Sequence, residues 1–348
     1  MARTANSLAR RYPALTLPLF AMNTVEYPQR KQAVIMLLLT NLFWGVSFPV
    51  VKALGLVHAD IVPAAGTWFA TFYCIAPRFV LATLVLMAVQ YRSFWRMTKA
   101  EWQQGALIGL FSAAGMLLQN DGLQFTEAST SAFLTQFYAI LIPLTLAIWQ
   151  RRNPGASVWW SCLLVLAGVA ILGRFDWQSF SFGRGETETL VCSVFFMGQI
   201  MCLGWKRFAG NRPEKITFVM FATQALIFSS LAAVAAPDAT TLLVPWQSEV
   251  WLGLTLILTL FCTIGSFTLM NTWQPRISTT EAGLLYCFEP IFASIMALML
   301  PAWFSRWAGF DYPNETVTWT LLIGGALITA ANLIILLRPP RVTLSVAN

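Results

Sequence analysis

The stretch AGLLYCFEPIFASIMALMLPAWF, residues 282–304, decides the class of fold. Glu289 is its only charged residue. About 20 consecutive apolar residues in an α-helix are long enough to cross the hydrocarbon core of a bilayer. The stretch is apolar on all its faces, whereas a strand of a membrane barrel alternates polar and apolar residues. A transmembrane helix is therefore predicted here.

Nine further runs of the same kind lie along the chain. With the first they are residues 32–54, 63–91, 102–120, 128–149, 156–173, 189–205, 216–236, 250–273, 282–304 and 316–337. Seven of these ten runs contain no charged residue. Of the 348 residues, 57% are hydrophobic and only 11% are charged, whereas soluble domains carry about 25% charged residues. We therefore predict an all-α polytopic membrane protein with ten transmembrane helices.

The basic residues between the runs predict the orientation in the membrane. An even number of spans places both termini on one side, and that side then receives 17 of the 22 Lys and Arg residues. Arg78 lies inside a span, and the opposite side receives Lys52, Arg174, Arg184 and Arg306. Cytoplasmic loops carry the excess of Lys and Arg. Both termini are therefore predicted to be cytoplasmic tails, residues 1–31 and 339–348, of a protein in the bacterial inner membrane.

Few residues are available for enzyme or metal chemistry. His58 is the only histidine, so two-histidine zinc sites are excluded and any Ser/His/Asp triad has to use it. The six cysteines lie in or beside apolar runs without a CxxC pair, which favours buried reduced thiols. No phosphate-binding glycine motif is present, which argues against ATP-driven transport by this chain alone. We expect no metal, no other cofactor, no enzymatic activity and no nucleic-acid partner.

A weak internal repeat divides the chain into two halves. An offset of 150 residues aligns Leu110 with Leu260, Phe111 with Phe261, Gly115 with Gly265, Gln124 with Gln274, and Leu134 with Leu284. An offset of 153 places Phe43 and Gly45 on Phe196 and Gly198. The constant offset predicts two five-helix repeats, residues 32–186 and 187–338. Because five is odd, the second repeat enters the membrane inverted, and such repeats place a solute site near the midplane and permit alternating access.

These segments resemble the EamA-type permeases of the drug/metabolite transporter superfamily over about residues 32–338. The resemblance is carried by Asn41, Trp44, Gly45, Ser47, Phe48 and Lys52, by Arg78 and Phe79, by residues 126–143 and 166–169, and by residues 281–284 with Glu289 and Pro290. Three features depart from the family pattern: the basic residues at 151–152, the long connection at 58–77 and an insertion at 301–314. The resemblance implies the fold and the transport of small metabolites, and it says little about the solute.

Two charged residues lie deep inside predicted spans, away from the span ends. Glu289 lies about 12 Å beyond Glu281 in a helix, near the middle of the membrane. An ionised carboxylate there costs several kcal/mol unless it is partnered, so Glu289 is expected to face the bundle interior. It is either a proton or cation coupling group or a packing residue beside a Pro290 kink. Arg78 either snorkels to the outer interface or binds a solute carboxylate or Glu289.

Neutral side chains at comparable depth complete the candidate site. Asn41, Gln136 and Gln199 are candidate solute ligands, or they form interhelical hydrogen bonds. Trp44, Tyr138 and Tyr286 are candidate aromatic walls, or they pack against lipid and other helices.

Three prolines are candidate hinges, because a proline inside a helix frees a carbonyl and kinks the axis. They are Pro49, Pro143 and Pro290.

The sequence thus predicts an inner-membrane secondary transporter that exports amino acids, amphipathic or aromatic metabolites or organic cations by alternating access. Its expected partners are the small-molecule solute, membrane lipid and, as a further hypothesis, coupled protons. An uncoupled facilitator or exchanger, and a membrane enzyme or lipid-handling protein, are the alternatives.

Overall fold

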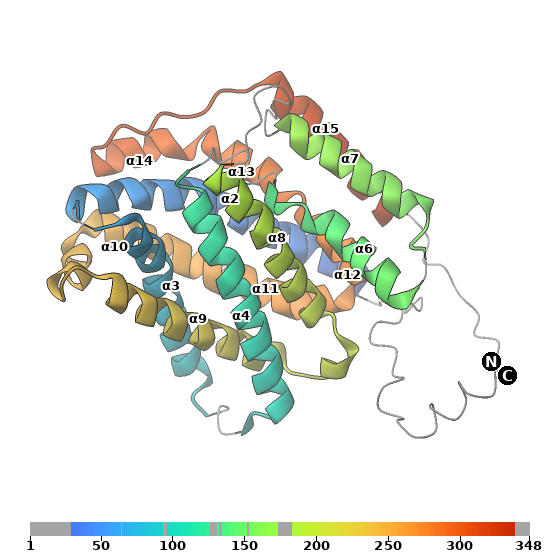
Figure 1. Cartoon of the computed structure of the whole chain (residues 1–348), viewed down its shortest axis with the longest axis horizontal. Coiled ribbons are helices and arrows are strands. Elements are labelled where there is room, and N and C mark those ends of the chain that lie inside the picture. The colour runs from blue at the N-terminus through green and yellow to red at the C-terminus, as the bar shows by residue number, and fades with distance from the viewer. Residues whose placement is uncertain are drawn as a thin grey trace.

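The computed structural model describes residues 29–63, 65–92, 96–125, 131, 134–151, 153–172 and 183–337. This part of the chain is all-helical and contains no strand (Figure 1). The helices of the first half are α2 (Arg30–Ile61), α3 (Thr67–Gln90), α4 (Lys99–Gly122), α6 (Tyr138–Gln150) and α7 (Ala156–Leu172). The predicted tails 1–31 and 339–348 lie outside the described residues except for residues 29–31.

The second half repeats long helices and adds shorter ones. They are α8 (Arg184–Leu203), α9 (Pro213–Ala235), α10 (Glu249–Ile257), the π-helix η6 (Leu258–Gly265), α11 (Ser266–Trp273), α12 (Thr279–Tyr286), α13 (Glu289–Ala297), α14 (Leu300–Ala308) and α15 (Trp319–Leu336). Short 3₁₀ turns include η5 (Val244–Gln247) and η7 (Gln274–Arg276).

Several of these helices are long and apolar enough to cross a membrane. Within the described residues, five stretches meet this criterion: α2, α3, α8, α9 and the continuous stretch Glu249–Arg276. Residues 279–308 form a sixth if α12, α13 and α14, which include a bend of 50°, count as one span. The helices α6, α7 and α15 are apolar but contain shorter apolar windows. A polytopic helical membrane protein is therefore confirmed, and the number of ten spans stays a prediction.

The long helices pack in pairs (Figure 1). α4 lies against α8 and α9, α3 against α9, α2 against α13 and α11, and α7 against α15. Glycines permit some of these close approaches, because a Cβ at Gly105 of α4 would lie 2.5 Å from the Cβ of Val219 on α9. Small residues at such positions let helix backbones approach within a membrane.

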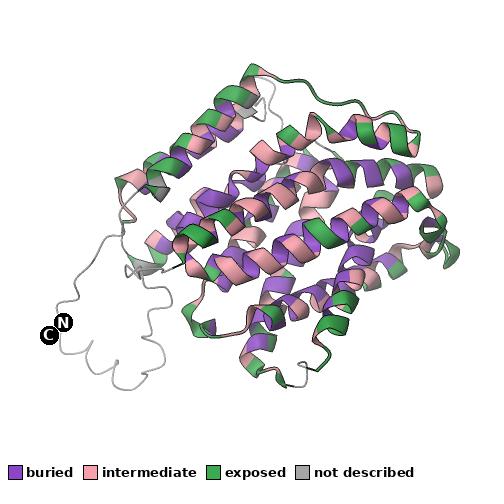
Figure 2. Ribbon diagram, turned by 180° about the vertical axis from the view of Figure 1, so that it is seen from behind, coloured by how far each residue is buried: buried purple, intermediate pink, exposed green. Residues whose placement is uncertain are grey.

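The burial pattern agrees with a bundle surrounded by lipid. Buried residues line the helix faces that point to the interior, and exposed residues cover the outside (Figure 2). Large apolar side chains are among the exposed residues, for example Val234 at 86%, Leu226 at 71% and Ile148 at 70%. Apolar surface on this scale is unusual on soluble monomers. It is the surface that hydrocarbon chains solvate.

The structure differs most from the predicted spans at three places. The first span runs to Ile61, beyond the predicted end at residue 54, because His58 packs as a buried ring against Phe69, Tyr73 and Trp251. The sixth span starts at residue 184, earlier than the predicted 189. Residues 282–304 do not form one helix, since the chain breaks between α12 and α13 and bends again before α14.

Candidate functional site

A cavity with about 600 Å³ of empty space, part of it open to solvent, lies among the helices of the bundle. Its wall is formed by Trp44, Ser47, Arg78, Met116, Gln119, Thr135, Tyr138, Phe196, Gln199, Ile200, Cys262, Phe267, Met270, Tyr286 and Glu289. These residues come from α2, α3, α4, α6, α8, α11 and α12–α13 and from the segments between them. Six of the eight side chains predicted for the site line this cavity, and the exceptions are Asn41 and Gln136.

Aromatic rings form much of the wall. The indole of Trp44 lies edge-on to Phe267, with ring centroids 5.6 Å apart, and its centroid is 5.3 Å from that of Tyr286. The Tyr286 hydroxyl donates to Oε1 of Gln274 at 2.9 Å, and Gln274 in turn donates to the carbonyl of Ile200 at 2.8 Å. Tyr286 is thus held in a fixed orientation by α8 and η7.

Glu289 stands where the helix of the ninth predicted span is interrupted. α12 ends at Tyr286, two residues form a turn, and α13 begins at Glu289 with Pro290 in its first turn. Proline has no N–H to donate, so it suits the first turn of a helix and cannot continue a preceding one. The Glu289 side chain is only 9% exposed and interacts with the side chain of Gln136. Gln136 therefore contacts the acid without lining the cavity itself.

Asn41 supports the interruption from the neighbouring helix. Its amide nitrogen donates to the carbonyl of Leu37 at 2.7 Å and to the carbonyl of Leu285 at 3.3 Å. One turn further along α2, a Cβ at Gly45 would lie 2.6 Å from the Cβ of Phe292. The backbones of α2 and α13 are therefore in close contact. Asn41 donates a hydrogen bond to a carbonyl group next to the break between α12 and α13.

Arg78 lies at the centre of α3 and does not reach the outer interface. It is 2% exposed, and its Nη2 atom donates to the sulfur of Met116 at 3.6 Å. The snorkelling interpretation is therefore wrong. Gln199 similarly donates to the sulfur of Met270 at 3.7 Å, and Tyr138 is buried at the start of α6.

The three candidate hinges differ in their surroundings. Pro49 and Pro143 lie inside the unbroken helices α2 and α6. Pro290 lies at an actual break. The π-helix at Leu258–Gly265 is a further irregularity beside the cavity, which Cys262 lines. The apolar run 250–273 does not reveal the π-helix, because the same amino-acid composition suits an α-helix and a π-helix.

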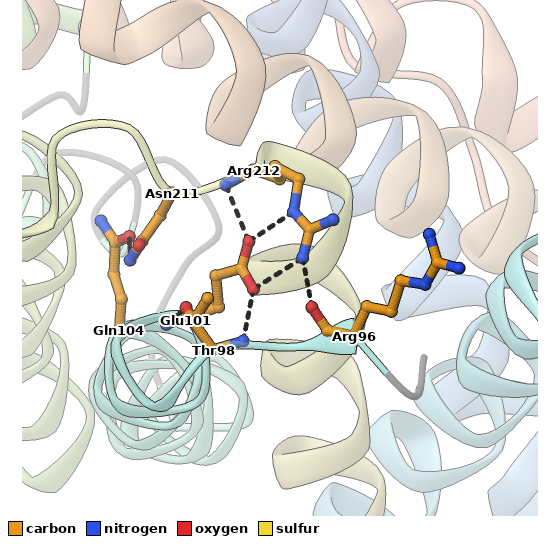
Figure 3. A network of polar contacts seen from close by, with 6 residues as sticks. All are labelled: Arg96, Thr98, Glu101, Gln104, Asn211 and Arg212. Atoms are coloured by element: carbon orange, nitrogen blue, oxygen red, sulfur yellow. Dashed lines mark hydrogen bonds and ion pairs between the residues drawn. The ribbon is translucent and has the colours of Figure 1, made fainter. Parts of the chain in front are cut away.

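A network of polar contacts connects the first turn of α4 to the residue before α9 at one end of the bundle (Figure 3). The carboxylate of Glu101 accepts from Nε of Arg212 at 2.7 Å, from Nη2 at 3.0 Å and from the backbone N–H of Thr98 at 2.8 Å. Arg212 also donates to the carbonyl of Arg96 at 2.7 Å. Hydrogen bonds from Arg212 lower the pKa of the Glu101 carboxyl, which precedes the apolar run 102–120, to about 2. Arg30 pairs with Glu281 at 2.8 Å at the same end.

A second ion pair connects the end of α4 to the start of α8 at the other end of the bundle, and it was not predicted from the sequence. Asp121, at the end of α4, is fully buried and pairs with Nη2 of Arg184 at 2.5 Å. Arg184 also pairs with Glu188 at 2.9 Å, and its guanidinium lies 4.4 Å from the ring centroid of Phe125. Asp121 is therefore a buried acid in addition to Glu289. A charged residue at the end of an apolar run is indistinguishable from a solvated loop residue.

The described residues contain no cluster that would hold a metal. Within them, no three His, Cys, Asp or Glu side chains come together in a metal-binding arrangement. All six cysteines are buried and unpaired. The thiols are thus placed as the sequence predicts.

The all-helical fold, with a largely apolar cavity lined by residues of several membrane-capable helices, defines a polytopic membrane protein with a central pocket. Residues 31–174 match the EamA-like transporter family. A protein from Archaeoglobus fulgidus named as an uncharacterized transporter is 24% identical over 319 residues, which cover 90% of this chain and 88% of that protein. Both matches bear out the resemblance to EamA-type permeases and support a membrane transporter of the drug/metabolite transporter type.

A solved structure shares the fold. A protein known from a crystal structure superposes with a TM-score of 0.62 over 88% of this chain and 97% of its own. Its sequence is 19% identical, so the similarity concerns the fold alone.

Proposed function

We propose that the protein is a secondary transporter that exports a small metabolite across the bacterial inner membrane by alternating access, with Glu289 as the proton-coupling group. The observation that carries the proposal is the central cavity, whose wall includes Glu289 and Arg78 among aromatic rings. Ionisable groups inside a membrane bundle mark solute and ion pathways. Both termini are cytoplasmic in this proposal, and the ten spans form two inverted repeats, residues 32–186 and 187–338.

Paired contacts support the inverted repeats. A Cβ at Gly115 of α4 would lie 2.7 Å from the ring of Phe196 on α8. A Cβ at Gly265 would lie 3.1 Å from the ring of Phe43 on α2. The repeat aligns Gly115 with Gly265 and Phe43 with Phe196. Each of the two contacts therefore takes the place of the other when the two halves are interchanged. A two-fold axis in the membrane plane has this effect.

Helix pairing supports the same symmetry. α3 lies against α9, and α7 lies against α15. Each of these pairs joins a helix to its counterpart in the other half. The turn before α6, at residues 136–137, also falls within one residue of the position that corresponds in the repeat to the break at residues 287–288 between α12 and α13. Both interruptions are next to cavity residues.

Exposed aromatic residues support the boundaries of the spans. At the end where α3 and α15 begin, Trp68, Trp303 and Trp319 are 42%, 53% and 78% exposed. At the opposite end, Trp102 and Trp149 are 48% and 57% exposed. Tryptophan collects at the two membrane–water interfaces. The aromatic residues thus fit a bundle that spans the bilayer from end to end.

Flux measurements in proteoliposomes test the proposal. A screen of amino acids, aromatic metabolites and organic cations identifies a solute, and an imposed pH gradient then drives its movement. We expect wild-type flux to follow the gradient and Glu289→Gln to bind solute while losing this dependence, because glutamine keeps the shape of glutamate but cannot cycle a proton. Glu249→Gln, at an exposed position at the start of α10, is the matched control.

Other outcomes identify the alternatives. Solute flux that ignores the gradient in wild-type protein contradicts coupling and supports an uncoupled facilitator or exchanger. Absence of flux for every solute class contradicts transport and supports a membrane enzyme or lipid-handling protein. If Glu289 is a packing residue only, Glu289→Gln changes thermal stability while flux keeps its dependence on the gradient.

A further inference from the structure

Arg78 is a buried cation that forms no ion pair with any of the residues that the structure describes. Its exposed fraction is 2%. Its Nε atom is buried without a hydrogen-bond partner in this part of the chain. The Nη2 contact is to the sulfur of Met116, and the guanidinium lies 5.2 Å from the ring centroid of Phe79.

Such surroundings leave much of the interaction capacity of the guanidinium unused. A guanidinium carries five N–H donors and a permanent positive charge, and a thioether sulfur is a weak acceptor. Burial of an ion away from water costs several kcal/mol unless a partner of opposite charge compensates. Because Arg78 lines the cavity, a ligand in the cavity is able to supply that partner.

The rest of the wall limits the ligand further. Among the described residues that line the cavity, Arg78 is the only cationic side chain, whereas Trp44, Tyr138, Phe196, Phe267 and Tyr286 contribute rings. One planar guanidinium matches one carboxylate through two parallel hydrogen bonds. A phosphate dianion needs more positive charge than one arginine provides.

We propose, on the basis of the transport function proposed above, that the solute is an organic monocarboxylate with an apolar or aromatic body, and that Arg78 binds its carboxylate. The body lies against the rings of Trp44 and Phe267. Glu289 lines the same cavity, so the ammonium group of a zwitterion also finds a partner there. Cations that lack a carboxylate are poor ligands, because Arg78 repels them.

Three related probes test this inference by binding to the purified full-length protein in detergent. They are L-phenylalanine, 3-phenylpropionate, which lacks the amine, and phenethylamine, which lacks the carboxylate. Titration calorimetry is expected to show that both carboxylates bind at least 10-fold more tightly than the amine. A 10- to 100-fold difference in affinity corresponds to about 1.4–2.8 kcal/mol, which is the range that a charge-assisted hydrogen bond contributes.

Substitutions at Arg78 test the residue directly. Arg78→Gln is expected to weaken 3-phenylpropionate 10- to 100-fold without weakening phenethylamine, and Arg78→Lys is expected to keep part of the affinity. Arg306→Gln removes a positive charge from the exposed face of α14 and serves as the control. If Arg78→Gln does not fold, the comparison of the three probes on wild-type protein decides alone.

The possible results separate this inference from the proposed transport. Equal or tighter binding of phenethylamine overturns the inference, as does an unchanged affinity of Arg78→Gln for 3-phenylpropionate. Failure of both carboxylates to bind wild-type protein also overturns it. Carboxylate binding that depends on Arg78, with no flux of the same probe in proteoliposomes, supports the inference and contradicts the transport proposal instead.

Discussion

The contact between Glu101 and Arg212 ties the two halves together at one end of the bundle, and its removal has a calculable effect. Glu101 belongs to the first turn of α4, and Arg212 is the residue that precedes α9. The carboxylate accepts from Nε, Nη2 and the backbone N–H of Arg212 and from the backbone N–H of Thr98. Glu101→Gln removes the charge while it keeps the size of the side chain.

The magnitude follows from burial and exposure at the two ends of the contact. Glu101 is 2% exposed, and hydrogen bonds to a charged group contribute about 1.5–3 kcal/mol each. The Arg212 side chain is 41% exposed, so water screens part of the attraction. Glutamine also retains one acceptor oxygen. We therefore expect Glu101→Gln to lower the free energy of unfolding by about 2 kcal/mol at neutral pH.

The effect depends on pH, with a definite sign. The pKa of the Glu101 carboxyl lies at about 2, below its ordinary value of 4.5, because Arg212 donates to the charged form. The stabilisation is fully present above about pH 4.5 and is lost as the pH falls toward 2. The difference in stability between wild-type protein and Glu101→Gln is therefore expected to shrink as the pH falls from 4.5 to 3.

Thermal unfolding in detergent, followed between pH 7 and pH 3, measures this difference. At pH 7 we expect a melting temperature several degrees lower for Glu101→Gln than for wild-type protein. The control Glu249→Gln, at an exposed position, is expected to melt like wild-type protein. A difference that stays constant or grows below pH 4.5 would refute the assignment of the carboxylate as the stabilising form.

Two further predictions concern the opposite end and the helix contacts. Arg184→Gln leaves the fully buried carboxylate of Asp121 without its ion pair, so the melting temperature is expected to fall and to recover when Asp121→Asn is added; no recovery in the double variant contradicts this explanation. Gly115→Val forces its side chain against the ring of Phe196 and is expected to cost about 1–3 kcal/mol, whereas Gly55→Val, whose Cβ meets nothing within 4 Å, is expected to cost much less. Equal losses in circular-dichroism melts of the two glycine variants would contradict the close α4–α8 contact.

The positions of the helices could be predicted from the sequence, because a long apolar run can adopt few structures other than a helix within a membrane. The break at Glu289 and Pro290 was readable in part, since proline marks a kink. Its capping by Asn41 was not, because the carbonyl of Leu285 lies 244 residues away along the chain. The role of a polar residue depends on partners that only the packed bundle brings near it.

The depth of charged residues was the least predictable feature. Arg78 lay within reach of the interface by helix rise alone, yet α3 places it in the bundle interior. Asp121 gave no signal, since an aspartate at the end of an apolar run is normally solvated. Its burial comes from Arg184, which begins α8, a helix that starts earlier than the apolar pattern indicates. The sequence alone therefore does not show which distant helix ends form ion pairs with each other.

Accessibility of the cavity from both sides of the membrane tests the central claim of alternating access. Cys262 lines the cavity, so a variant that keeps this cysteine and replaces the other five carries a native reporter there. A membrane-impermeant maleimide is applied to right-side-out and to inverted membrane vesicles, with and without a transported solute. The account predicts labelling of Cys262 from both sides, with solute changing the balance between them. Labelling from one side only under every condition would contradict it.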